Sequence, residues 1–169
     1  MTLPFVVVEA GPAVLADARA DLRAVGWHVV GRLDDGPRSG GLVLALPVAD
    51  EDAAAVALFS AIEGVGLLVD ASAAERHVVD RLCDDLRRIG HLDHRVSAAG
   101  PLLDEEERAV MDLLAGGSTL GAAATALHLS RRSADRRLAS ARAKLGAPAT
   151  GAAIAAYRRR LERLPHPSA

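Results

Sequence analysis

The chain has 169 residues, half of them hydrophobic, and a formal net charge of −2, so it can bury a core as one domain or as two small ones. No apolar run approaches the ~18 residues of a membrane span and no leader peptide is expected, which excludes a membrane protein. The single cysteine, Cys83, excludes an internal disulfide, and a soluble protein of a reducing cytoplasm is expected.

The first 97 residues alternate short apolar runs with amphipathic segments. The predicted strands cover residues 5–10, 27–33, 42–48, 66–72 and 91–96. The predicted helices between them cover residues 12–26, 50–64 and 74–90. Because each strand is apolar throughout, this alternation predicts an α/β domain over 1–97 with a parallel sheet covered on both faces.

A short linker over 98–102 separates this half from a second half without strands. Four helices are predicted within 103–164, and residues 165–169 form a tail. Asp104 and Glu107 form a capping box at the start of the first of these helices. Thr119 and Ser130 are suited to cap the second and third helices.

Charge is distributed unevenly along the chain. Residues 1–100 carry 9 bases and 15 acids, whereas residues 131–163 carry 10 bases and 2 acids. Within the segment LSRRSADRRLASARAKLG (129–146), alanine and leucine follow one helical stripe and arginines follow the opposite side. A short helix, a tight turn and a basic helix predict a helix-turn-helix whose second helix enters the major groove. The alternative is a solvated arginine-rich surface.

Residues 103–146 resemble the LuxR/GerE-type DNA-binding domain. The matches have fixed, ungapped spacing: Leu103, Glu107, Arg108, Val110, Leu113, Leu114, Ala115, Gly117, Ala124, Leu127, Leu129, Ser130, Arg132, Leu138, Lys144, Leu145 and Gly146. The resemblance and the charge pattern together imply contacts with double-stranded DNA by Thr119, Ser130, Arg131, Arg132, Ser133, Arg136, Arg137, Ser140 and Lys144. The family's fourth helix pairs two subunits, which implies a homodimer with Ile154 and Tyr157 in its interface.

Several positions depart from the family pattern. Gly121 stands where a lysine is usual, which removes a phosphate contact. Alanines at 122, 123 and 134 thin the core, where the loss of an isoleucine-sized side chain costs ~2–5 kcal/mol if nothing refills the space. These departures predict weakened or dimer-dependent DNA binding.

The N-terminal half resembles, mainly by element order, the receiver domain of NarL/FixJ-type response regulators. Aspartyl phosphorylation needs clustered carboxylates around a divalent cation, a carboxylate acceptor, a hydroxyl and a lysine. Here the corresponding positions are Glu9, Ala10, Leu46 and Asp70, and this half contains no lysine. The resemblance therefore implies a degenerate pocket without phosphorylation, so that dimerisation or a protein or small-molecule partner would supply control.

Other sites receive little support. His91, Asp93 and His94, with His77 and Cys83, match no metal-ligand spacing, so no metal or cofactor is expected. No pattern indicates an enzyme. The sequence predicts a DNA-binding transcription regulator at the nucleoid. The alternative is a partner-binding protein whose helix-turn-helix has lost DNA affinity.

Overall fold

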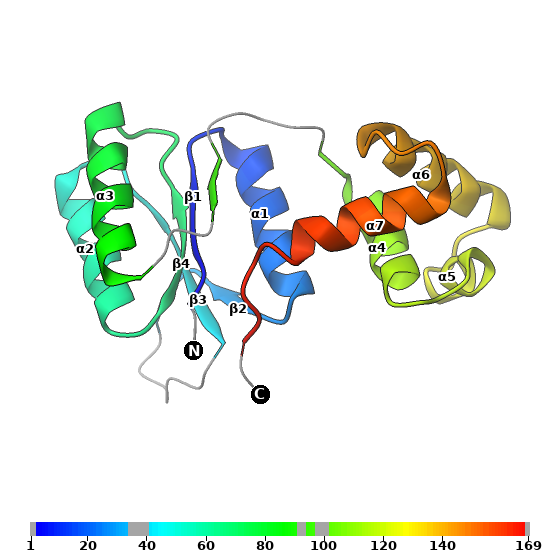
Figure 1. Cartoon of the computed structure of the whole chain (residues 1–169), viewed down its shortest axis with the longest axis horizontal. Coiled ribbons are helices and arrows are strands. Elements are labelled where there is room, and N and C mark those ends of the chain that lie inside the picture. The colour runs from blue at the N-terminus through cyan, green and yellow to red at the C-terminus, as the bar shows by residue number, and fades with distance from the viewer. Residues whose placement is uncertain (1–2, 34–40, 91–93, 97–101, 168–169) are drawn as a thin grey trace. The chain divides into compact units, whose positions relative to one another are not determined.

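Figure 1 shows the computed structural model of the chain, which describes residues 3–33, 41–90, 94–96 and 102–167. The chain divides into two compact units. The first comprises Met1–Ala99 together with Arg163–Ala169, and the second comprises Gly100–Glu162. Most of the linker predicted over 98–102 lies outside the described residues.

The first unit is built on a parallel sheet, as its apolar runs predict. Its strands are β1 (Phe5–Val8), β2 (His28–Val30), β3 (Leu42–Pro47), β4 (Gly66–Asp70) and β5 (His94–Val96). They lie in the order β2-β3-β4-β1-β5, and every pair of neighbours runs parallel. All four residues of β1 are buried because this strand lies inside the sheet, with neighbours on both sides.

Helices cover both faces of this sheet. Helix α1 (Pro12–Ala24) lies on one face, and helices α2 (Glu51–Ile62) and α3 (Arg76–Ile89) lie together on the other (Figure 1). This distribution follows from the right-handed crossover of parallel βαβ units. The connection from β1 to β2 runs toward one edge of the sheet, whereas those from β3 to β4 and from β4 to β5 run toward the other.

The strand order corrects one part of the receiver-like prediction. A receiver-like sheet has the order 2-1-3-4-5, with the first strand between the second and third. Here β1 instead pairs with β4 and β5. Apolar runs indicate that strands are buried and parallel, but buried strands have similar patterns, so these runs do not indicate which strands are neighbours.

The C-terminal residues pack on the first unit instead of forming a free tail. The indole Nε1–H of Trp27 donates to the carbonyl oxygen of Pro165 (2.5 Å). Pro167 lies so close to Gly26 and Gly41 that a β-carbon at either glycine would approach it to 3.4 or 3.3 Å. Leu164 is buried. Isolated turn and tail residues carry no periodic signal, so this packing could not be predicted from the sequence.

The second unit is all-helical, as predicted. It contains α4 (Glu105–Ala115), α5 (Leu120–Ala126), α6 (Arg131–Lys144) and α7 (Thr150–Leu161). Helix α4 packs against the other three helices. Its residues Val110, Met111 and Leu114 belong to the hydrophobic core of the second unit. Within the described ranges, no helix combines the length and the apolar composition that a bilayer crossing needs.

Candidate nucleic-acid interface

The turn between α5 and α6 is defined by a left-handed residue that ends α5 and a cap that begins α6, and a second cap begins α5. Thr119 Oγ1 accepts from the Ala122 amide (3.2 Å) at the start of α5, and Ser130 Oγ accepts from the Ser133 amide (3.1 Å) at the start of α6. His128 has φ 54°, and it ends α5 with the amide pattern of a Schellman motif. The four-residue link over 127–130 therefore holds α5 and α6 in a fixed turn.

Helix α6 has a buried side and an exposed side. Ala134, Leu138 and Ala141 are buried in the second unit. The opposite side presents Arg132, Arg136, Ala139 and Ala143, all of which are exposed. Neither Arg132 nor Arg136 has a hydrogen-bond or ion-pair partner among the described residues. We call these four residues the outer face of α6. Its small alanines leave room for a close approach to a partner.

Arg137 does not belong to this face. Its guanidinium forms an ion pair with Glu106 and lies 3.9 Å from Asp104 Oδ2, both at the start of α4. Its side chain is only 28% exposed, and its Nε is buried without a partner in the described structure. In the folded chain Arg137 thus links α6 to α4, and the DNA contact predicted for this arginine would have to break this ion pair.

Lys144 and Ser140 are engaged in the same way. The Glu107 carboxylate is 2% exposed and accepts from Lys144 Nζ (2.6 Å) and Ser140 Oγ (2.5 Å). It also accepts from the Asp104 amide (2.9 Å), which completes the predicted capping box. A buried carboxylate needs such partners. In the folded chain both side chains satisfy Glu107, so the DNA contacts predicted for Ser140 and Lys144 would compete with these hydrogen bonds.

Arg131 lies at the edge of the outer face. It is exposed and forms an ion pair with Asp135 (3.4 Å), one turn along α6. Its Nη1 would lie 3.5 Å from a β-carbon placed on Gly121 of α5. The guanidinium of Arg131 therefore supplies positive charge beside the position at which the family pattern has a lysine.

Tyr157 of α7 is also buried within the second unit, with 0% exposure. Its hydroxyl donates to Asp112 Oδ1 (2.6 Å) and accepts from Arg108 Nη1 (3.2 Å). The predicted role of Tyr157 in a dimer interface is corrected, because its side chain links α7 to α4. Ile154 is partly buried and packs against the same core.

The residues of the predicted degenerate pocket all lie at the carboxyl edge of the sheet. Glu9 and Ala10 follow β1, Leu46 lies near the end of β3, and Asp70 ends β4. The connections from β1 and β4 leave in opposite directions, so this edge is the switch point at which ligands bind in many α/β sheets. The Asp70 carboxylate accepts hydrogen bonds from its near neighbour Ser72, from both the amide and the hydroxyl (3.1 and 2.6 Å).

Glu9 is held by Arg95, a residue that the sequence analysis did not single out. Arg95 Nε and Nη2 donate to the two Glu9 oxygens (2.8 and 3.0 Å), and its Nη1 lies 2.7 Å from Asp80 Oδ1. These hydrogen bonds lower the pKa of Glu9 and raise that of Arg95, although burial opposes both shifts.

No cluster of metal-ligating side chains is found among the described residues. Of the metal candidates weighed from the sequence, His91 and Asp93 lie outside the described residues. Cys83 is buried in the core of the first unit, and burial raises the pKa of its thiol.

No family model matches the chain. No curated protein matches it either. Among solved structures, the chain is similar to the response regulator RcsB of Salmonella typhimurium, whose structure is described in terms of conformational dynamism for DNA interaction. That match has 16% sequence identity and a TM-score of 0.35, and it covers 94% of this chain and 100% of the other.

Proposed function

We propose that the protein is a DNA-binding transcription regulator without enzymatic activity, and that the outer face of α6 enters the major groove. The observation that carries the proposal is the pair Arg132 and Arg136, exposed one turn apart and without partners in the described structure. Arginine forks suit both phosphate oxygens and the acceptor edge of guanine. Thr119, Ser130 and Ser133, at the exposed starts of α5 and α6, would contact phosphates.

We further propose that aspartyl phosphorylation does not control this activity. By the resemblance to a receiver, Leu46 would correspond to the acceptor, and an aliphatic side chain cannot accept a phosphoryl group. Glu9 is already neutralised by the Arg95 guanidinium. Control would come from homodimer formation or from a partner or ligand of the first unit. With Tyr157 buried, Ile154 remains the partly accessible candidate for a dimer contact on α7.

Selection of genomic DNA fragments by the full chain tests the proposal, followed by fluorescence anisotropy on an enriched fragment and a scrambled one. We expect the doubly substituted Arg132→Ala, Arg136→Ala chain to lose at least about tenfold in affinity, since each good base contact contributes ~1–3 kcal/mol. The matched control, Arg159→Ala, removes an exposed arginine of α7 and should change affinity by much less. Equal losses in both variants would contradict a specific role for α6.

One observation favours the second candidate, a partner-binding protein whose helical unit has little DNA affinity. Arg137 and Lys144, two of the bases expected at DNA, are engaged by acids of α4. Absence of binding at low salt, where counterion release favours it most, would support this candidate.

Phosphorylation is tested separately by incubating the chain with acetyl phosphate and Mg²⁺ and measuring its intact mass. We expect no adduct. An adduct on an acid at the carboxyl edge of the sheet would refute the proposal of phosphorylation-independent control.

A further inference from the structure

The C-terminal residues occupy a small site on the first unit. The site comprises a buried tryptophan and two glycines: Gly26, Trp27 and Gly41. We call these three residues the Trp27 site, and we call residues 164–167 the C-terminal segment. In that segment Leu164 is buried, Pro165 and Pro167 are half-buried, and His166 is exposed. The segment therefore lies along the surface of the first unit, with His166 in solvent.

One hydrogen bond joins the C-terminal segment to its site. The buried indole of Trp27 donates its Nε1–H to the carbonyl oxygen of Pro165 (2.5 Å). Residues 164–167 make no other hydrogen bond or ion pair within the described part of the chain. A buried indole N–H needs an acceptor, which the C-terminal segment supplies. Apart from this bond, apolar contacts of Leu164 and Pro167 hold the segment in place.

Two glycines form a flat surface for Pro167. Gly26 follows α1 and Gly41 precedes β3, and both have φ 98°. The His28 amide donates to the Gly41 carbonyl oxygen (2.7 Å), which ties the two backbones together. A β-carbon at Gly26 would lie 3.4 Å from Pro167 Cγ, and one at Gly41 would lie 3.3 Å from Pro167 Cβ. The proline ring thus lies against backbone that carries no side chain.

The sequence of the C-terminal segment makes it stiff before it binds. It reads Leu-Pro-His-Pro, so that Leu164 and His166 each precede a proline. A residue before proline favours an extended backbone, and proline itself fixes φ near −65°. Such a segment loses little conformational entropy on binding, and its carbonyl oxygens are free to accept hydrogen bonds. Aromatic-lined grooves that recognise proline-containing peptides use these two properties.

The C-terminal segment is also a second connection between the two units. The first unit comprises Met1–Ala99 and Arg163–Ala169, so the chain leaves this unit once and returns to it after the helical unit. While the segment is bound, the helical unit is attached to the first unit at both of its ends. Release of the segment would leave the helical unit attached through its N-terminal end alone.

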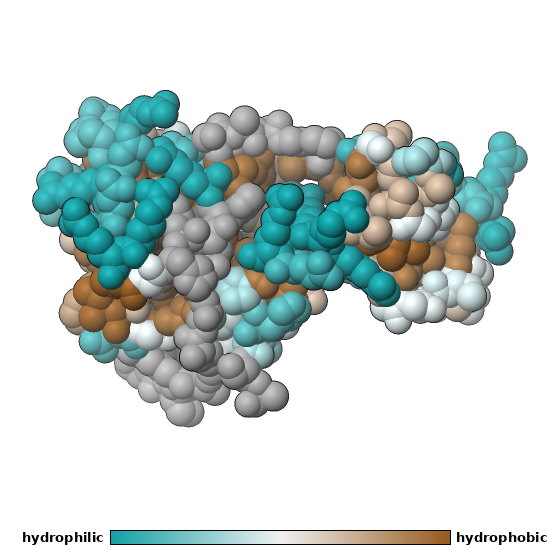
Figure 2. All heavy atoms as spheres, viewed as in Figure 1, coloured by the Kyte–Doolittle hydropathy of each residue, from teal (hydrophilic) through white to brown (hydrophobic). Residues whose placement is uncertain are grey.

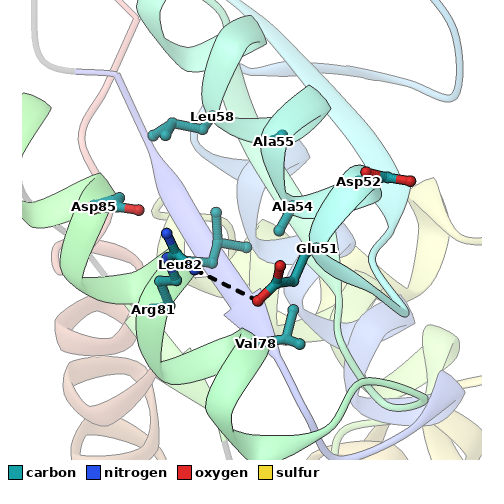
Figure 3. Close-up of a pocket in the computed structure, with 9 residues that line it drawn as sticks. All are labelled: Glu51, Asp52, Ala54, Ala55, Leu58, Val78, Arg81, Leu82 and Asp85. Atoms are coloured by element: carbon teal, nitrogen blue, oxygen red, sulfur yellow. Dashed lines mark hydrogen bonds and ion pairs between the residues drawn. The ribbon is translucent and has the colours of Figure 1, made fainter.

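Another surface of the first unit lacks such an occupant. Val56, Phe59 and Ile62 of α2 are exposed, and Figure 2 shows apolar atoms gathered where α2 and α3 end. Figure 3 shows a groove of about 360 Å³ that side chains of these two helices line. No described segment of the chain lies in this groove, so nothing indicates what would bind there. At Trp27, by contrast, the bound segment itself shows which chemistry fits.

We propose that the Trp27 site recognises extended Leu-Pro-x-Pro segments, that the C-terminal segment is its intramolecular ligand, and that a partner protein with such a segment displaces it. Only Glu162 and Arg163 separate α7 from Leu164. This short connection gives the C-terminal segment an effective concentration on the order of millimolar. A partner must therefore bind the site more tightly than the chain's own segment does.

This inference supplies a form of partner control for the proposed regulator. Its test contains no DNA, so a failure here would leave the proposed role of α6 intact. A failure of DNA binding would in turn leave the Trp27 site intact.

The first experiment uses the unsubstituted chain and hydrogen exchange measured by NMR. Trp27 is the sole tryptophan, so its indole proton gives a single resonance that reports on this site. We expect the protection factor of this proton to be at least about tenfold lower than that of the Val7 amide in β1, because the segment opens without global unfolding. Equal protection, with the same dependence on urea, would overturn the proposal.

The second experiment titrates a peptide of residues 163–169 into the full-length Leu164→Asp variant, whose own segment should be released. The Trp27 indole resonance reports both affinity and location. We expect saturable binding that returns this resonance to its position in the unsubstituted chain. The unsubstituted chain should bind the peptide at least about tenfold more weakly, because its own segment competes. The matched control, His166→Asp, changes the exposed residue of the same segment and should behave like the unsubstituted chain.

A control peptide with aspartate in place of its leucine should not bind the Leu164→Asp variant. Equal binding of both peptides, or no binding of either, would overturn the proposal. Loss of the folded circular dichroism spectrum in Leu164→Asp would also overturn it, because Leu164 would then be a part of the core that cannot be exchanged. Dimerisation of the unsubstituted chain that Leu164→Asp abolishes would refute the choice of a partner protein, in favour of exchange of segments between two copies.

Discussion

The two sides of helix α6 carry the same kind of charge and use it differently. On the flank that faces α4, Arg137 and Lys144 form ion pairs with Glu106 and Glu107. On the outer face, Arg132 and Arg136 have no partner among the described residues. In a basic helix, the candidate DNA-binding residues are therefore the arginines and lysines that form no ion pair within the fold. Net charge alone does not distinguish the two groups.

The largest effect expected from this comparison is on stability. Lys144→Ala leaves the Glu107 carboxylate buried without its cation, and we expect the free energy of unfolding of the second unit to fall by about 3–5 kcal/mol. Arg136→Ala, on the outer face, should change it by no more than about 0.5 kcal/mol. Urea denaturation of both variants measures the difference. Similar small losses would show that Lys144 is not a structural residue.

In the first unit, Arg95 is a paired basic residue like Arg137 and Lys144 of α6. Glu9→Gln should cost about 1.5–3 kcal/mol at neutral pH, since a hydrogen bond between charged groups is lost. The pKa of Glu9 is lowered from 4.5 in the folded chain. The stability that the pair contributes is therefore fully present above pH 4.5 and is lost as pH falls through the lower folded pKa. Urea denaturation between pH 7 and pH 3 should show a shallower decline for Glu9→Gln than for the unsubstituted chain.

A substitution at Tyr157 tests whether this side chain serves to pack α7 against α4. Tyr157→Phe removes the buried hydroxyl between Arg108 and Asp112, and we expect a loss of about 1–2 kcal/mol. Oligomeric state, measured by light scattering, should not change. A shift from dimer to monomer at unchanged stability would restore the dimer role first expected of this residue.

The smallest effect concerns the turn that presents the outer face. Helices α1, α2, α4 and α6 are each followed by a glycine with positive φ, whereas α5 is followed by His128 at φ 54°. His128→Gly should relieve this conformation and raise the unfolding free energy by up to about 1 kcal/mol. DNA affinity should not change, because the turn geometry is kept. Destabilisation would indicate that the imidazole makes a contact worth more than the strain.

Much of the fold could be predicted from local patterns. Apolar runs and helical stripes predict the α/β and all-α units, and the caps at Asp104, Thr119 and Ser130 all form as predicted. Strand order and the packing of Leu164 and Pro167 on the first unit could not be predicted. They depend on contacts between residues far apart in the chain, which leave no periodic signal.

The candidate site was predictable in part. The stripe of Ala134, Leu138 and Ala141 defines the exposed side of α6 and thereby selects Arg132 and Arg136. The pairing of Arg137 and Lys144 was hidden, because their acids lie over 30 positions away on α4. The role of Arg95 was hidden for the same reason, since its partner Glu9 follows another strand, 86 positions away.

The most direct test of the account is the salt dependence of DNA affinity. Each contact between a basic side chain and a DNA phosphate contributes about 0.9 to the slope of log affinity against log salt concentration. We predict that Arg132→Ala and Arg136→Ala each weaken DNA binding. A lost phosphate contact would reduce the slope by about 0.9, and a lost contact with a nucleobase would relax the sequence preference. Arg137→Ala should leave both the slope and the sequence preference of the folded chain unchanged. If Arg137→Ala reduces the slope and the two outer-face variants do not, the division of α6 into a paired flank and a DNA-binding outer face is contradicted.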